Sequence, residues 1–357
     1  MSSASSRFQI NSLTATRAVA AIMVFIHHFG ADIFPFNRCP SVFHSGNVAV
    51  GYFFVLSGFV LFISYHDKVI SYGDFMKRRI GRIVPIYLIA LLMAIYVAVA
   101  FNKYDLFAMQ SIKEIVLSAL FLQSFVPSYP LVLNGPGWTI SVEMAFYVLF
   151  PLLLLFQKKS FRSFIILTAV LYLGAQYFHL KYYPQRHSLD DNIVDTIFFS
   201  PEIHISQFLI GMIGAGIFNK IRYTVPKYRF LPLAMFAVII LLIAYRPENL
   251  SYQVGLIAPL FMLLILFIAI SDPKSLNFRP LVYLGEISYG IYILQQPVHK
   301  YLEAMNTQYL HIPIQVFFWF ALGVLIAVAS ATYYLIELPL RKKISAITFK
   351  RKTVPAA

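Results

Sequence analysis

The sequence predicts an all-α protein: a polytopic membrane helix bundle of about ten transmembrane helices plus one re-entrant or interfacial segment, with both termini cytoplasmic. Of the 357 residues, 59% are hydrophobic and only 12% are charged, about half the charged share of an ordinary soluble domain. Mean hydropathy is +0.71, and long apolar stretches recur along the chain. The single cysteine, Cys39, excludes an intramolecular disulfide and a thiolate metal cluster.

Ten apolar stretches account for the predicted helices, each near the length of roughly 20 residues that crosses a bilayer. They cover residues 13–32, 48–65, 83–101, 138–156, 164–179, 204–218, 230–245, 252–270, 281–298 and 313–336. We therefore expect a cytoplasmic tail at 1–12, a membrane domain at 13–340 and a basic cytoplasmic tail at 341–357. We do not expect the first stretch to be a cleaved signal peptide, because Arg17 interrupts it and no small-residue cleavage site follows.

The positions of Lys and Arg predict how these helices are oriented. The net charge of +14 would suggest a nucleic-acid partner in a soluble protein. Here the tails and alternate loops place 22 of the 29 basic residues in the cytoplasm, as the positive-inside rule requires. The two ends of the chain agree in orientation only if 102–137 begins and ends outside. We therefore predict that 112–125 is re-entrant or interfacial, and we expect no nucleic-acid partner.

The first predicted span carries Arg17, His27 and His28, and such groups at membrane depth are candidates for function. Arg17 and His28 are eleven residues apart, so they share one helix face roughly 16 Å apart along the axis. A structural alternative is that Arg17 reaches the inner surface while the histidines contact water at the outer end.

A basic group precedes the third predicted span. Arg79 and Arg82 are three residues apart, close enough on a helix to bind one phosphate together. Pro85 is typical of a first helical turn, where free amides also favour anions. The alternatives are an anchor at the inner surface or contact with lipid head groups.

Carboxylates are rare within the predicted spans. Glu143 lies about one and a half turns into the fourth span, so it is protonated, paired or facing a polar cavity. A structural ion pair with Arg17 or a histidine is the alternative to a catalytic role. Glu286 and Glu337 lie at span ends, and we expect Pro339 to stop the last helix.

Small residues in two spans are most simply explained by close helix packing. They are Ser57 and Gly58 in the second span, and Gly285, Ser288 and Gly290 in the ninth.

The sequence has no Walker loop, Rossmann glycine pattern, G-x-S-x-G elbow or H-E-x-x-H motif. These absences argue against a nucleotide-driven pump, a classical hydrolase and a zinc protease.

Together these segments resemble the acyltransferase-3 family of integral membrane acyltransferases, from end to end and in the same order. The matching motifs are Arg17-x10-His28, Phe53-Phe54-x-Leu56-Ser57-Gly58-Phe59, Arg79-x-x-Arg82-Ile-x-Pro85-x-Tyr87, Trp138-x-x-Ser141-x-Glu143-x-x-Phe146-Tyr147, Gly285-x-x-Ser288-Tyr289-x-x-Tyr292 and Glu337-x-Pro339. The resemblance implies an O-acetyltransferase of the bacterial inner membrane. It would move an acetyl or other acyl group from cytoplasmic acyl-CoA, its co-substrate, to a hydroxyl of an envelope carbohydrate. No metal is expected.

The chemistry of a thioester assigns roles to these residues. The thioester is already activated, so the enzyme needs mainly a base for the hydroxyl and groups that stabilise the oxyanion. We expect His28 to be that base or a transient acyl carrier, with Glu143 or Glu337 orienting it and Arg17 guiding the donor. The donor-binding residues would be Arg79, Arg82 and Tyr87, and the motif residues that bind substrate or support structure would be Ser57, Trp138, Ser141, Ser288 and Tyr289.

Two features depart from the family pattern. Where members often carry a Trp-His-Trp-like stretch, this chain has Leu294-Gln295-Gln296-Pro297, and we see no fused esterase-like domain. The membrane domain is then expected to complete the transfer alone.

The acceptor and the function class have alternatives. Lipopolysaccharide O-antigen is the first expected acceptor, followed by peptidoglycan, exopolysaccharide, antibiotics and lipids. Membrane lipids and a lipid-linked saccharide are further expected partners. A proton-coupled secondary transporter or flippase is the alternative function, although no internal repeat is evident. A non-catalytic receptor leaves the aligned polar residues unexplained.

Overall fold

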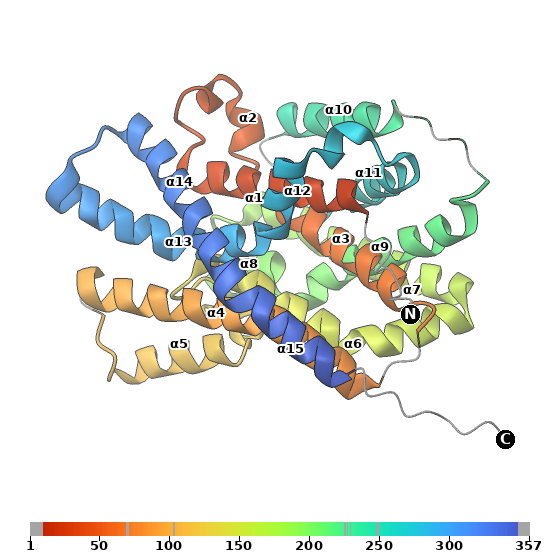
Figure 1. The fold of residues 1–357 in the computed structure, drawn as a ribbon, viewed down its shortest axis with the longest axis horizontal. Coiled ribbons are helices and arrows are strands. Elements are labelled where there is room, and N and C mark those ends of the chain that lie inside the picture. Colours follow the sequence, from red (N-terminus) through yellow and green to blue (C-terminus); the bar gives the residue numbers. More distant parts are fainter. Residues whose placement is uncertain are drawn as a thin grey trace.

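The computed structural model describes residues 10–68, 71–102, 104–224, 226, 228, 230–247 and 250–348, and this part of the chain is helical with no β-strand (Figure 1). Its α-helices are α1 (Asn11–Phe29), α2 (Pro40–Phe43), α3 (Val48–Tyr65), α4 (Tyr72–Asn102), α5 (Met109–Ala119), α6 (Trp138–Lys159), α7 (Phe161–Tyr182), α8 (Asp191–Phe199), α9 (Pro201–Ile221), α10 (Leu231–Ala244), α11 (Ala258–Ser271), α12 (Arg279–Glu286), α13 (Ser288–Met305), α14 (Ile314–Thr332) and α15 (Leu338–Thr348). Residues 1–9 and 349–357 of the two predicted tails lie outside the described residues, as do Lys103, Lys227 and Arg229, which entered the charge distribution.

Seven segments of the described chain are long and apolar enough to cross a membrane: Asn11–Phe29, Val48–Tyr65, Tyr72–Phe101, Gly135–Lys159, Phe161–Gln185, Asp191–Ile221 and Ile314–Ile344. The helices α10 and α11 are apolar but shorter, at 14 residues each, or about 21 Å. The all-α, multi-pass membrane fold is therefore confirmed. The count of ten spans and the cytoplasmic location of both termini stay predictions.

The sequence suggested a loop for the basic group before the third span, but the structure has a helix there. The helix α4 begins at Tyr72, so Arg79 and Arg82 are helical and Pro85 lies in the helix interior. The prediction that Pro85 marks the first turn was wrong, because the polar residues before it continue the same helix. The amides near Arg79 are therefore not free ends that favour an anion, and the charges of the two arginines must act by themselves.

The chain also continues beyond Pro339, where the sequence predicted a stop. A π-helical turn covers Tyr333–Glu337 and leads directly into α15. The wider turn relieves the clash that a proline ring makes with the preceding carbonyls, so the backbone remains helical. As a result α15 packs against α4, and Gly81 of α4 lies directly against the side chain of Ile344.

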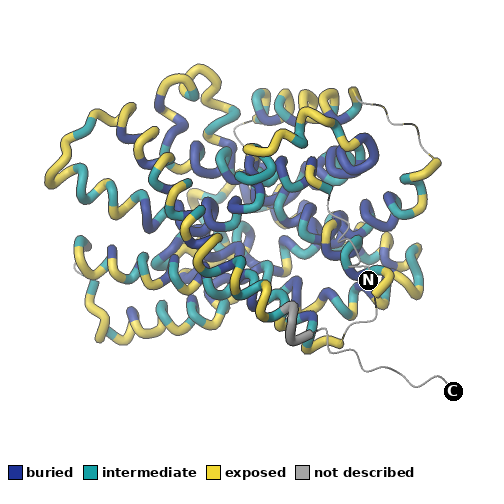
Figure 2. Tube along the Cα trace, viewed as in Figure 1, coloured by how far each residue is buried: buried dark blue, intermediate teal, exposed yellow. Residues whose placement is uncertain are grey.

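The centre of the bundle is built on close contacts between helix backbones, where buried residues predominate (Figure 2). The helices α3 and α9 have the most extensive contact in the fold. A Cβ atom at Gly58 would collide with the carbonyl of Phe208, and one at Gly211 would collide with the carbonyl of Val55. These two glycines therefore permit the crossing, as expected for small residues between membrane helices.

The segment predicted to be re-entrant or interfacial forms the 11-residue helix α5 and a short 3-10 turn at Gln123–Phe125. A helix of this length rises only about 16 Å and does not cross a bilayer. Two hydrogen bonds fasten its end to α6, from Ser124 Oγ to the carbonyl of Trp138 at 2.8 Å and from Ser141 Oγ to the carbonyl of Phe121 at 2.6 Å. The segment is thus held against the bundle.

Candidate active site

A cavity of about 770 Å³ lies inside the bundle, between α1, α3, α4, α6, α13 and the junction of α14 with α15. Its lining follows α3 from Val50 to Tyr65, nearly the whole helix. Seven basic side chains and two carboxylates line it: Arg17, Lys68, Arg78, Arg79, Arg82, Arg341, Lys342, Glu143 and Glu286. Most of the sequence-predicted polar residues therefore share one chamber.

Glu143 projects into this cavity from α6 and accepts two hydrogen bonds. Ser57 Oγ donates from α3 at 3.2 Å, and the hydroxyl of Tyr147, one turn further along α6, donates at 2.5 Å. Among the described residues Glu143 forms no ion pair, so the structural ion pair considered from the sequence is absent there. The carboxylate is oriented by hydroxyl groups and has one face toward the cavity.

Arg17 lines the cavity from α1 and is half-buried. Its guanidinium interacts through space with Arg82 and with the carboxylates of Glu337 and Glu143. Arg17 therefore shares the cavity with an arginine of α4 and with the carboxylate of α6.

Arg79 is surrounded by aromatic rings on the inner wall of the cavity. It donates a hydrogen bond to the hydroxyl of Tyr65 at 3.1 Å, and its guanidinium lies 5.5 to 5.8 Å from the ring centres of Tyr65, Phe75 and Tyr147. Its buried Nε has no hydrogen-bond partner in the described part of the chain. A guanidinium held this way retains donors for an anionic ligand.

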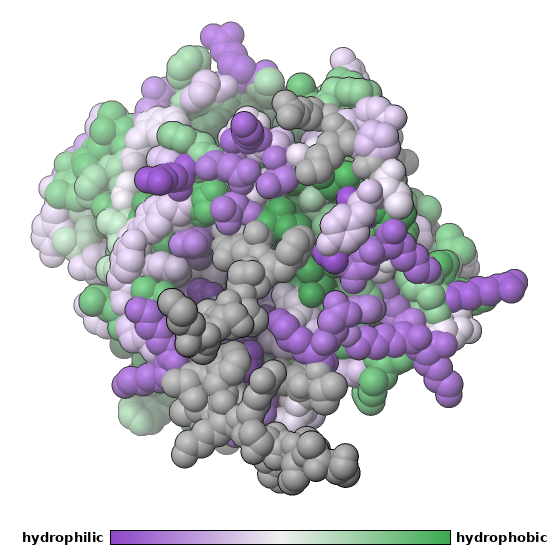
Figure 3. All heavy atoms as spheres, turned by 45° about the vertical axis from the view of Figure 1, so that its right-hand side comes forward, coloured by the Kyte–Doolittle hydropathy of each residue, from purple (hydrophilic) through white to green (hydrophobic). Residues whose placement is uncertain are grey.

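The surface of the molecule has a hydrophilic face, and the cavity has a basic end built by α4 and α15. Figure 3 shows hydrophilic side chains gathered on the face that comes forward in that view. Arg341 and Lys342 of α15 line the same cavity as Arg79 and Arg82 of α4. One end of the chamber is therefore strongly positive.

Glu337 lies beside the cavity without lining it. Its side chain is 3% exposed and accepts from Arg341 at 3.3 Å, one turn along the chain. Glu286 does line the cavity and accepts from the hydroxyl of Tyr333 at 3.2 Å. The placement of Glu337 makes it a charge partner for Arg341.

Three of the predicted site residues lie away from the cavity and fasten the α5 segment. Tyr87 donates to the carbonyl of Ser118 at 2.9 Å and accepts from Gln123 at 3.1 Å. Trp138 packs its ring against other aromatic side chains, and Ser141 makes the hydrogen bond to Phe121 given above. Their contacts are structural.

Two other motif residues hold the break between α12 and α13. Ser288 Oγ donates to the carbonyl of Gly285 at 2.8 Å, and the hydroxyl of Tyr289 donates to the carbonyl of Ile83 at 2.8 Å. Both residues also line the cavity. The carbonyl of Ile83 is thereby tied to α13, next to the turn of α4 that carries Arg79 and Arg82.

His28 lies at the opposite end of α1 from Arg17 and is exposed. Its ring centre is 5.0 Å from that of His27, and no hydrogen bond or ion pair joins it to Glu143 or Glu337 among the described residues. The prediction that either carboxylate orients His28 directly is therefore not supported by this arrangement.

Sequence reasoning missed His299 of α13, which stacks on Phe29 with ring centres 3.8 Å apart and an interplanar angle of 12°. It also missed Tyr147 as the second donor to Glu143. Tyr147 is one helical turn from Glu143, so the spacing alone predicts that their side chains are neighbours. His299 had no such signal, because its neighbour comes from a different helix.

The fold and cavity define an integral, multi-pass membrane protein with a charged chamber inside its helix bundle. The chain belongs to the acyltransferase-domain family, whose family model matches residues 10–336. The resemblance noted from the motifs is thereby confirmed. No solved structure matches the chain.

Three relatives illustrate the family. The "Putative peptidoglycan O-acetyltransferase YrhL" of Bacillus subtilis is 26% identical over 93% of this chain and 55% of its own length. The O-acetyltransferase OatA of Staphylococcus aureus is 24% identical over 93% of this chain and 57% of its own length. The acyltransferase MdmB of Streptomyces mycarofaciens is 34% identical over 40% of this chain and 39% of its own length. The chain thus spans little more than half the length of the relatives that match nearly all of it.

Proposed function

We propose that this protein is a membrane O-acyltransferase that moves an acyl group, most simply acetyl, from acyl-CoA to a hydroxyl of a cell-envelope carbohydrate. Membership of the acyltransferase-domain family and the O-acetyltransferase names of two relatives support this reaction class. The observation that carries the proposal is the single cavity that holds Arg79, Arg82, Arg17 and Glu143 together.

The donor would bind at the basic end of the cavity. The phosphates of CoA are suited to paired contacts with arginine, and Arg79 has unused donors. With its phosphates at Arg79 and Arg82, the extended arm of CoA would carry the thioester deeper, toward Arg17 and Glu143. Tyr87, expected from the sequence to bind the donor, is left out because its hydroxyl is fully engaged with Ser118 and Gln123.

The reaction requires a base, an oxyanion partner and a leaving thiolate. The acceptor oxygen attacks the thioester carbonyl, a C–O bond forms, and the C–S bond breaks as the tetrahedral intermediate collapses to release CoA thiolate. For transfer within the cavity, Arg17 would stabilise the oxyanion, and Glu143 would take the proton of the acceptor hydroxyl and then give it to the CoA thiolate. For transfer completed at the outer end of α1, roughly 16 Å further along the helix, His28 would be the base for that hydroxyl or would carry the acyl group.

The orientation follows from the charge distribution. We infer ten spans with both termini cytoplasmic, in a bacterial inner membrane, with residues 13–340 as the membrane domain. The basic ends of α4 and α15 lie together at the mouth of one cavity, as the positive-inside rule favours for a cytoplasmic face. That face is where acyl-CoA is available.

Three acceptors are to be tested. The name of YrhL states peptidoglycan, which makes that polymer the first acceptor to test. The O-antigen of lipopolysaccharide, expected from the family resemblance and the size of the chain, is the second, and a lipid-linked saccharide precursor of either is a third.

The test uses the purified full-length protein with acetyl-CoA, with and without soluble peptidoglycan fragments or O-antigen. We expect free CoA thiol to appear only with an acceptor, together with an acetylated glycan in the mass spectrum. Glu143→Gln is the control for background hydrolysis. Absence of CoA release with every glycan would overturn the proposal and favour the transporter or flippase alternative.

A further inference from the structure

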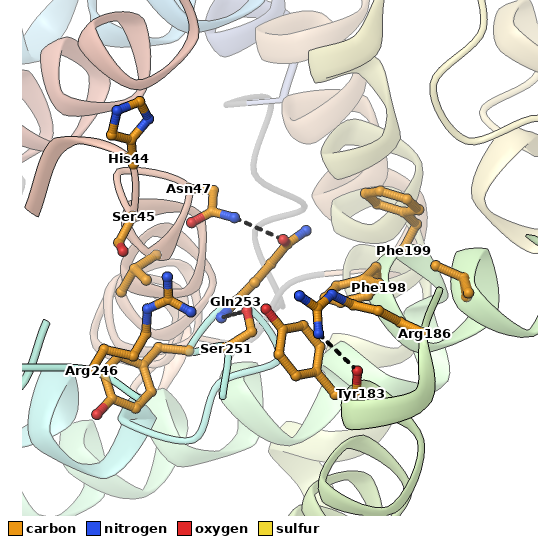
Figure 4. A pocket seen from close by; sticks show the side chains of 13 residues that line it. His44, Ser45, Asn47, Tyr183, Arg186, Phe198, Phe199, Arg246, Ser251 and Gln253 are labelled. Atoms are coloured by element: carbon orange, nitrogen blue, oxygen red, sulfur yellow. Dashed lines mark hydrogen bonds between the residues drawn. The ribbon is translucent and has the colours of Figure 1, made fainter. Parts of the chain in front are cut away.

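A second pocket, of about 360 Å³, lies outside the cavity (Figure 4). Three parts of the chain far apart in sequence form it: the loop into α3, the stretch from the end of α7 to the end of α8, and the turn after α10. All three belong to loops that the orientation places outside. Its volume is at the lower end of the range for ligand pockets, about 300–1,000 Å³, and suits one or two sugar rings.

Two arginines from different loops give this pocket a positive charge. Arg186 and Arg246 line it from opposite sides (Figure 4), and none of the described residues that line it is Asp or Glu. Neither arginine forms an ion pair within the described part of the chain. Arg186 donates to the carbonyl of Tyr183 at 3.1 Å, and Arg246 donates to the carbonyl of Leu250. Because a guanidinium has five donors, both retain donors for an anion.

Neutral polar groups lie between the arginines. Asn47 donates to Gln253 at 2.8 Å, which fixes the amide pair across the pocket. Ser45 Oγ is buried and has no hydrogen-bond partner in the described residues. A buried unpaired hydroxyl is costly, and a ligand hydroxyl would satisfy it.

Aromatic rings complete the lining. Tyr183 and Phe198 pack edge to face with ring centres 5.7 Å apart, and Arg186 lies 4.2 Å from the ring centre of Tyr183. Rings beside amides and hydroxyls are the combination that contacts both the C–H face and the hydroxyl groups of a sugar. Unpaired arginines add recognition of a carboxylate.

The pocket adjoins the histidine end of α1. Gly46, next to Ser45, lies so close to α1 that a Cβ there would be 2.6 Å from the carbonyl of Met23 and 2.7 Å from the Cβ of His27. The segment that lines the pocket therefore packs on the turn of α1 that precedes His28.

We propose that this pocket binds a carboxylate-bearing sugar of the acceptor glycan, with Arg186 and Arg246 binding the carboxylate. The identification of the sugar as the acceptor rests on the proposed function, whereas the binding itself does not. A bound sugar would present the rest of the glycan toward the end of α1.

The test measures binding without acetyl-CoA, by calorimetry with the purified full-length protein in detergent. The probes are glucuronic acid, whose carboxylate stays free within a glycan, and its methyl ester, which lacks the charge. We expect the acid to bind at least tenfold more tightly, and Arg186→Gln or Arg246→Gln to remove this preference. Arg38→Gln, an exposed arginine of the same predicted side that does not line the pocket, is the matched control.

Equal binding of acid and ester, or wild-type preference in both variants, would overturn the proposal. Binding of phosphatidylglycerol micelles to the protein without binding of the acid would also overturn it, since the ligand would then be a lipid phosphate. Arg186→Lys, which keeps the charge, should retain part of the preference, and this separates loss of charge from misfolding. Binding of the acid without CoA release in the transfer assay would refute the proposed function alone, and CoA release with unselective binding would refute this pocket alone.

Discussion

The inner cavity and the outer pocket are both positively charged, yet their charges are arranged differently. In the cavity, basic residues surround a carboxylate that accepts hydrogen bonds from Ser57 and Tyr147. In the outer pocket, Arg186 and Arg246 line the space, and no acidic residue is found among the described residues of its lining. A site with both signs of charge can stabilise charge that develops and disappears in a reaction, whereas a site with one sign binds a complementary ligand. We therefore expect chemistry in the cavity and ligand recognition in the pocket.

The two regions also differ in the elements that build them. Long helices supply the cavity, and loops supply most of the pocket. Helices hold reacting groups in fixed geometry, while loops accept sequence change without loss of the fold. Differences in acceptor between members of the family are therefore expected to concentrate in the loops around Arg186 and Arg246.

The strongest test of this contrast removes the carboxylate of the cavity. Glu143→Gln keeps the size of the side chain but loses its charge, and we expect transfer activity to fall by about 10²–10⁴-fold. Glu286→Gln, at the other carboxylate of the cavity, should have a much smaller effect. The measurement is acceptor-dependent CoA release at matched protein levels. Wild-type activity in Glu143→Gln would show that the carboxylate in the cavity takes no part in the transfer reaction.

A second test concerns the far end of α1. His28→Ala should lower transfer by about 100-fold, at the lower end of the range for a general base, because the exposed site admits water as a substitute. It should leave the KM for acetyl-CoA unchanged, since His28 is remote from the basic end of the cavity. His27→Ala is the comparison variant. If His28→Ala is fully active, or if His27→Ala shows the larger loss, the base has been assigned to the wrong residue.

Substitutions in the proposed donor site should change activity less than the loss of Glu143 or His28. Arg79→Gln and Arg82→Gln should each raise the KM for acetyl-CoA by about 10-fold, since each removes a charged hydrogen-bond donor. Lys77→Gln is the matched control, because Lys77 is exposed on the same helix and does not line the cavity. Steady-state kinetics at varied donor concentration measure the change. An equal rise in all three variants would point to a general effect of surface charge.

The smallest effect is expected where a motif residue is structural. Tyr87→Phe removes the hydroxyl that joins Ser118 and Gln123, and it should lower the free energy of unfolding by about 1–2 kcal/mol with no change in the KM for acetyl-CoA. Tyr96→Phe, exposed on the same helix, is the control for stability. Thermal unfolding in detergent and donor kinetics are measured on the same preparations. A raised KM for acetyl-CoA at normal stability would show that Tyr87 contributes to donor binding.

Local pattern predicted much of the fold. The helix α3 begins at Val48 and ends at Tyr65, as expected, because its apolar run is bounded by polar residues on both sides. The hydropathy pattern failed to predict helix boundaries in two places. At the π-helical turn before Pro339, two helices meet without a polar loop between them. At Arg79, a charged stretch continues an apolar helix. In both cases the backbone follows contacts made elsewhere in the bundle, which hydropathy does not record.

The sequence by itself determined that this chain is a helical membrane protein and that Arg17 and Glu143 lie within its helices. Composition and periodicity suffice for this conclusion, because a charged group buried in hydrocarbon costs too much free energy unless it is paired or has a function. Only the tertiary structure decided which of these groups meet. Ser57 reaches Glu143 from a helix 86 positions earlier, His28 does not reach it, and three distant loops enclose the outer pocket. The spacing along one helix sets the face on which a residue lies, but the neighbour of that face depends on how the whole bundle packs.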